Sequence, residues 1–121
     1  MMNLSELESY CLSKSGAYKD YPFGAYPICY RLCGKIFAQL YPPEYGSKIT
    51  LKCSREEGDF FKAAFPKAVV SGYHCPPVQK PYWVTVYLDE ISDEALLHMI
   101  DTAYLRVLQG LPKSIRKMNN L

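Results

Sequence analysis

The sequence has few of the residues that catalysis requires. It contains only two histidines, and one of them, His98, stands between Leu97 and Met99 on a predicted helix, with no plausible catalytic partner in the sequence. Neither a glycine-rich phosphate loop nor a catalytic pair of carboxylates is present. A nucleophilic enzyme needs an activated nucleophile, a base and a group that orients the base. We therefore expect a non-enzymatic protein that uses no cofactor.

Metal-binding and disulfide patterns are also lacking. The five cysteines are an odd number and form no C-x-x-C pair, which indicates reduced thiols in a cytoplasmic protein. Cys53, His74 and Cys75 are the candidate zinc ligands. Zinc sites usually draw on close ligand pairs, and neighbours on an extended chain such as His74 and Cys75 point to opposite faces. We predict no metal site.

Long apolar runs and strong charge are absent as well. The N-terminus shows no signal-peptide pattern, and no apolar stretch has the length of a membrane span. The net charge of +2 argues against a strongly cationic nucleic-acid binder but leaves room for a local basic patch. Eleven tyrosines are present, and large amphipathic aromatic residues gather in cores and at binding surfaces. The length of 121 residues predicts a single domain, residues 1–121, with its own core.

Hydrophobic periodicity predicts three helices and five strands. We expect a helix that begins after Asn3 or Ser5 and stops at Gly16, and helices that begin after Ser54 and Ser92. The strands are expected at about residues 26–32, 35–41, 48–53, 69–73 and 80–88, with a tight turn at Cys33-Gly34, an ordered loop over 17–24 and a basic tail after the last helix. This order predicts an α+β two-layer sandwich, with a five-stranded antiparallel sheet and helices on one face.

Alternation along the strands divides the predicted sheet into two faces. The face toward the helices is expected to carry Ile36, Ala38, Leu40, Ile49, Leu51, Val84 and Val86. The open face is expected to carry Lys35, Phe37, Tyr41, Lys48, Thr50, Lys52, Trp83 and Tyr87. Aromatic and cationic side chains on one exposed face indicate an interface of some kind.

Several short motifs follow one another along nearly the whole chain. They are the segments 21–24 (YPFG), 34–38 (GKIFA), 51–53 (LKC), 72–74 (GYH), 83–89 (WVTVYLD), 103–104 (AY) and 111–113 (LPK). In this order they resemble the MmcQ/YjbR family of small bacterial proteins. The resemblance implies a two-layer domain with an antiparallel sheet, in an arrangement described as a double wing, and a DNA-binding role. Family members usually carry an Asn-Lys pair between the histidine and the tryptophan, whereas residues 75–82 form a longer segment here, in which only Lys80 matches.

These observations lead to one functional hypothesis and two alternatives. The first is a DNA-binding protein whose aromatic rings stack on bases while lysines pair with phosphates. Its predicted contact residues are Lys35, Lys48, Lys52, Lys80, Trp83 and Tyr87. The first alternative uses the same aromatic face to form a homodimer or to bind a protein partner. The second is a small-ligand pocket between the loop at 18–23 and the sheet.

Overall fold

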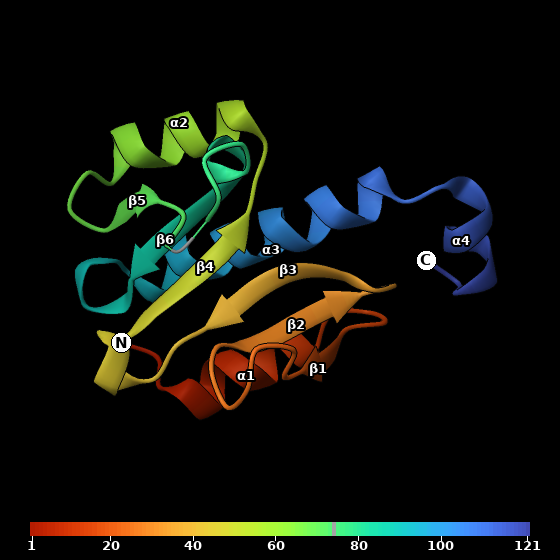
Figure 1. Ribbon diagram of the computed structural model, residues 1–121, viewed down its shortest axis with the longest axis horizontal. Coiled ribbons are helices and arrows are strands. Elements are labelled where there is room, and N and C mark those ends of the chain that lie inside the picture. The colour runs from red at the N-terminus through yellow and green to blue at the C-terminus, as the bar shows by residue number, and fades with distance from the viewer. Residues whose placement is uncertain (74) are drawn as a thin grey trace.

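The computed structural model describes residues 1–73 and 75–121, and within them six strands form one antiparallel sheet. Its spatial order is β1-β2-β3-β4-β6-β5. The strands are β1 Tyr18–Asp20, β2 Ile28–Leu32, β3 Lys35–Leu40, β4 Lys48–Lys52, β5 Val69–Ser71 and β6 Trp83–Tyr87. The helices are α1 Leu4–Leu12, α2 Arg55–Ala64, α3 Asp93–Gly110 and α4 Lys113–Met118. Figure 1 shows α3 running behind the central strands, with α1 beside β2 and α2 beside β5.

The predicted α+β two-layer fold with helices on one face is confirmed, and the sheet has one strand more than predicted. The additional strand is β1, which lies in the segment predicted as a loop and pairs with β2 at the sheet edge. Its three residues, Tyr-Lys-Asp, show no apolar alternation, so the hydrophobic pattern could not reveal it. The basic tail also contains a short helix, α4.

Local sequence signals account for the element boundaries. The side chain of Asn3 accepts a hydrogen bond from the Glu6 amide at 2.8 Å, and the Glu6 carboxylate accepts one from the Asn3 amide. The Ser92 side chain caps α3 in the way that the sequence predicts. Cys33 and Gly34 both have positive φ, at 48° and 82°, which is the conformation of a two-residue hairpin turn of type I′.

One ion pair fixes the start of α2 against α3. Ser54 and Glu57 form a capping box at the start of α2. The carboxylate of Glu57 also accepts two hydrogen bonds from the guanidinium of Arg106, at 3.1 and 2.9 Å. Burial opposes the charge on Glu57, but the bonds from Arg106 and Ser54 outweigh it and lower the pKa of the carboxyl group. The negative charge therefore persists at neutral pH and joins the two helices.

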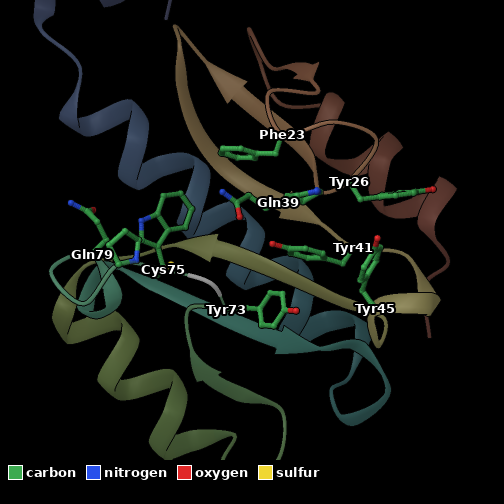
Figure 2. A pocket seen from close by; sticks show the side chains of 11 residues that line it. Phe23, Tyr26, Gln39, Tyr41, Tyr45, Tyr73, Cys75 and Gln79 are labelled. Carbon is green, nitrogen blue, oxygen red and sulfur yellow. The ribbon is translucent and has the colours of Figure 1, made fainter.

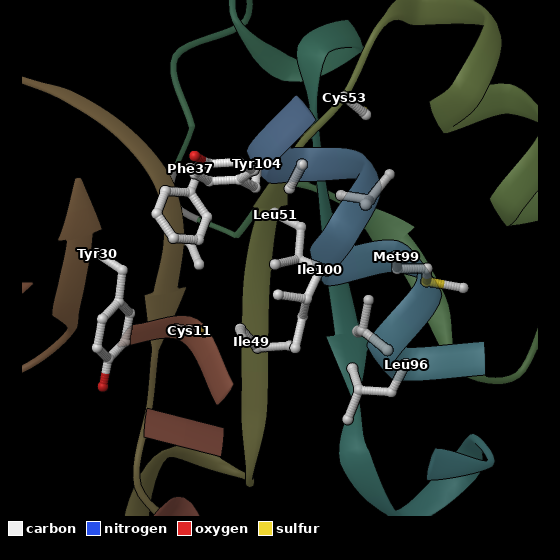
Figure 3. Close-up of a cluster of buried hydrophobic side chains, with 14 of the residues drawn as sticks. Cys11, Tyr30, Phe37, Ile49, Leu51, Cys53, Leu96, Met99, Ile100 and Tyr104 are labelled. Carbon is white, nitrogen blue, oxygen red and sulfur yellow. The ribbon is translucent and has the colours of Figure 1, made fainter. Parts of the chain in front are cut away.

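The core fills the space between the sheet and the helices (Figure 3). Ile49 and Leu51 of β4 face Leu96 and Ile100 of α3 in this cluster, and all four are at most 1% exposed. Cys11 of α1 and Tyr30 of β2 extend the cluster toward the other edge of the sheet.

In the described residues, no helix is both long enough and apolar enough to cross a lipid bilayer.

The prediction that Phe37 lies on the open face is wrong. The β2–β3 pairing passes from Tyr30 opposite Ala38 to Arg31 opposite Ile36, so Phe37 is an extra residue in β3 without a partner. This bulge breaks the alternation, and the ring of Phe37 is fully buried in an edge-to-face contact with Tyr104 of α3, 5.6 Å between centroids. Ile36, predicted for the core, is only partly buried.

Phenylalanine truncation distinguishes the core position from an exposed one. We expect Phe37→Ala to lower the free energy of unfolding by about 3–5 kcal/mol, because it leaves a cavity beside Tyr104. The matched variant Phe60→Ala, at a ring that is 65% exposed on α2, should change it by less than about 1 kcal/mol. Urea unfolding monitored by circular dichroism measures both. Equal effects of the two substitutions would contradict the buried position of Phe37.

Candidate ligand-binding face of the sheet

The sheet face opposite the helices carries a cavity of about 610 Å³, which we call the aromatic pocket. Figure 2 shows its walls, formed by the β1–β2 loop and by the segment that follows β5, above the central strands. Its lining residues are Phe23, Tyr26, Pro27, Gln39, Tyr41, Tyr45, Tyr73, Cys75, Pro76, Gln79 and Trp83. Small-molecule sites typically measure roughly 300–1,000 Å³ and are lined mainly by apolar and aromatic groups with a few polar ones. The aromatic pocket fits this description.

Tyrosines pack against one another at one end of the pocket. Tyr41 is the centre of the group, with ring centroids 5.4 Å from Tyr73 and 6.3 Å from Tyr45, and Tyr26 lies 6.2 Å from Tyr45. Edge-to-face and tilted contacts of this kind are favourable for aromatic rings. The rings therefore support one another at this end of the pocket.

Lys48, predicted as a DNA contact, lies beneath these tyrosines and is 6% exposed. Its Nζ donates a hydrogen bond to the Tyr45 carbonyl at 2.6 Å and lies 3.6 Å from the Tyr73 ring centroid and 5.4 Å from that of Tyr41. Burial lowers the pKa of this lysine. The ammonium group is occupied with the rings of the pocket wall, where cation–π attraction partly offsets the loss of water.

The second wall is attached to the sheet through backbone groups. The Gly72 amide donates to the Trp83 carbonyl at 3.1 Å, and the Tyr73 amide donates to the hydroxyl of Thr85 at 2.7 Å. Thr85 shares a further hydrogen bond of 2.8 Å with Thr50 on β4. Both threonines are fully buried, although alternation places them on the open face, because this wall covers them. We call these contacts the threonine link.

Beyond Trp83 lies a second cavity of about 460 Å³, which we call the basic hollow. Trp83 lines both cavities. The basic hollow is formed by Arg31, Gly34, Lys35, Ile36, Lys52, Trp83, Arg106, Val107, Gly110 and Leu111. The Nζ of Lys52 lies 5.1 Å from the Trp83 ring centroid and 5.6 Å from that of Tyr82.

The four cations of the basic hollow differ in their pairing. Arg31 is paired with Asp20 at 2.8 Å, and Arg106 with Glu57. Among the ion pairs found in residues 1–73 and 75–121, none includes Lys35 or Lys52. These two lysines therefore supply the positive charge that the basic hollow presents to a ligand.

Lys80 lies in a short 3₁₀ turn, Lys80–Tyr82, and is exposed. Burial raises the pKa of the Cys75 thiol, while the charges of Lys80 and Lys52 act in the opposite direction. His74, one of the three candidate zinc ligands considered from the sequence, lies outside the described residues. Within the described residues, no group of three or more metal-ligating side chains occurs.

The structure separates the predicted contact residues into two groups. Lys35, Lys52 and Trp83 meet at the basic hollow, with Lys80 in the turn that leads into β6. Lys48 and Tyr87 face each other at the other end of the β4–β6 pair, four residues or about 13 Å away.

Sequence reasoning missed most of the pocket wall, including Tyr26, Tyr45, Tyr73, Cys75 and Gln79. The tyrosine-rich and proline-rich loops were the available signal, but loops have no periodicity that shows where they fold back.

Glycine at position 72 is required for the close approach of this wall. A Cβ there would lie 2.5 Å from the Cys75 sulfur and 2.8 Å from the Trp83 Cβ. We expect Gly72→Ala to displace the wall, lower the unfolding midpoint and shift the emission of Trp83, which is the only tryptophan in the chain. The wild-type chain, measured under the same conditions, is the reference. An emission spectrum of G72A identical to that of the wild-type chain would contradict the proposed contact.

Comparison with known proteins finds a matching family model and similar proteins from other organisms. A family model described as YjbR matches residues 12–106. The Escherichia coli K12 protein described as uncharacterized protein YjbR is 26% identical over 118 residues, covering 97% of each chain, and so is the corresponding protein of strain O157:H7.

Two crystal structures are also similar. That of Deinococcus radiodurans protein DR2400, which carries a DUF419 domain, is 27% identical with a TM-score of 0.87, covering 100% of this chain and 90% of the other. A Pseudomonas syringae protein is 21% identical with a TM-score of 0.66, covering 84% of this chain and 96% of the other, and this likeness concerns the fold alone.

Proposed function

This chain belongs to the YjbR family, and from that premise we propose that it is a non-enzymatic protein that binds DNA with unpaired bases. The observation that carries the proposal is the position of Trp83, whose side chain lines both the aromatic pocket and the basic hollow. A nucleotide combines the two chemistries in the same order, a flat aromatic base joined through a sugar to an anionic phosphate. The proposal includes a cytoplasmic location, where all five cysteines remain free thiols.

Unpaired bases fit this surface better than a duplex. In double-stranded DNA the faces of the bases are covered by their neighbours, whereas rings in the walls of a cavity require an exposed base face. Stacking of a base on an aromatic side chain contributes about 1–3 kcal/mol and tolerates any sequence. The net charge of +2 is compatible with a contact to only a few nucleotides. The electrostatic part of the affinity for DNA depends on how many phosphates are neutralised, and here only the few lysines near the site neutralise them.

The roles of the six sequence-predicted residues differ in this proposal. Lys35, Lys52 and Lys80 contact phosphates, and Trp83 stacks on a base. Lys48 and Tyr87 act indirectly, since the Lys48 ammonium lies against the tyrosine rings of the pocket wall and Tyr87 is its neighbour across the strands.

Salt dependence tests the proposal. With three phosphate contacts, the logarithm of the association constant for a thymidine octamer should fall with the logarithm of salt concentration at a slope of about −2. Lys52→Ala should reduce that slope by about 0.7, and the matched variant Lys67→Ala, at an exposed lysine between α2 and β5, should leave it unchanged. Filter binding at several salt concentrations measures the slopes. Equal, negligible retention at low and high salt would refute DNA binding.

A second candidate is suggested by the exposed apolar side chains around the pocket. Phe23 is 64% exposed and Val78 is 77% exposed, one in each of the two flanking segments. Exposed apolar groups around a cavity are typical of protein interfaces. The same face would then join two copies of the chain or bind a protein partner.

Light scattering separates the two candidates. We expect a mass of one chain, 13.8 kDa, at micromolar concentration, because DNA binding as proposed needs the open face to be free. A mass of twice that value, returned to one chain by Trp83→Ala, would favour the interaction module instead.

A further inference from the structure

We propose that Gln39 selects adenine as the base bound in the aromatic pocket. This inference rests on the proposed function and specifies which base that site prefers. Gln39 belongs to β3, at the floor of the pocket, where it is partly buried among the aromatic walls. In Figure 2 its amide points into the middle of the pocket, toward the space that a bound base would occupy.

The amide of Gln39 is available for a ligand. Its partners across the strands are Cys29 and Thr50, and the hydroxyl of Thr50 is already bonded to Thr85. Among the side-chain hydrogen bonds of the described residues, none involves Gln39. Within the described residues, the only buried side-chain nitrogen or oxygen without a hydrogen-bond partner is Nε of Arg116. The amide atoms of Gln39, which also have no such partner, are therefore not buried and reach the cavity surface.

The chemistry of a carboxamide matches one edge of adenine. A glutamine presents one acceptor oxygen and a donor nitrogen side by side. Adenine presents the complementary pair on its N7 acceptor and its N6 amino donor, and glutamine binds both atoms at once. Guanine shows two acceptors at the same edge, and the pyrimidines have no N7 and a smaller ring to stack. In a pocket lined by rings, an unmatched amide loses its water without gaining a partner, which penalises the other bases.

The second glutamine of the pocket differs in position. Gln79 lies on the wall, is exposed, and its amide points away from the centre of the pocket in Figure 2. We therefore expect Gln79 not to discriminate among bases. This makes Gln79→Leu a matched control for Gln39→Leu.

The experiment uses fluorescein-labelled octanucleotides and fluorescence anisotropy. The three probes are a thymidine octamer, the same octamer with one central adenine, and the same octamer with one central 7-deazaadenine, which has carbon in place of N7. We expect the adenine probe to bind the wild-type chain about tenfold more tightly than the thymidine probe, within the range of a bidentate pair. The 7-deazaadenine probe should lose most of that gain.

The variants assign the preference to the amide. Gln39→Leu should bind all three probes with the affinity that the wild-type chain shows for the thymidine probe, whereas Gln79→Leu should keep the preference. Equal wild-type affinity for adenine and 7-deazaadenine, with salt-dependent binding intact, would overturn the role of Gln39 and leave the proposed function standing. Absence of binding to every probe at low salt would remove the proposed function, and this inference with it.

Discussion

The candidate site depends on the threonine link, through which the segment after β5 is attached to the centre of the sheet. The Tyr73 amide, Thr85 and Thr50 form a continuous series of hydrogen bonds, each 2.8 Å or shorter, and both threonines are fully buried. Buried hydrogen bonds of this kind are costly to break because the freed groups have no water to replace their partners. The link thus fixes one wall of the aromatic pocket, and Gly72 allows the backbone to come close enough to form it.

Charge pairing decides which part of the surface remains basic. The chain carries 14 cationic and 12 acidic residues, so its overall field is weak. Two of the four cations around the basic hollow are paired with Asp20 and Glu57, which also join β1 to β2 and α2 to α3. Lys35 and Lys52 are left beside Trp83. Positive charge is therefore concentrated next to the aromatic pocket in a molecule with little net charge.

Sequence patterns predicted the parts of the structure that depend on local chemistry. Capping residues marked the starts of α1, α2 and α3, the Cys33-Gly34 pair marked the hairpin, and alternation in β4 and β6 placed Lys52 and Trp83 together on the open face. The same reasoning failed at Phe37, because a β-bulge leaves no trace in a count of alternating residues. It also assigned Lys48 to an exposed surface, because periodicity does not show which residues a distant loop covers.

The amino-acid sequence by itself determined the order of the main helices and of strands β2 to β6, the α+β class and the two-sided character of the central strands, since helix periods, strand periods and caps act over a few residues. Only the tertiary structure decided that the open face is hollowed into a pocket beside a basic hollow. That result requires Phe23 and Tyr73, about fifty positions apart in the chain, to stand on opposite sides of Gln39. Their meeting depends on long-range hydrogen bonding and packing, which no short stretch of sequence encodes.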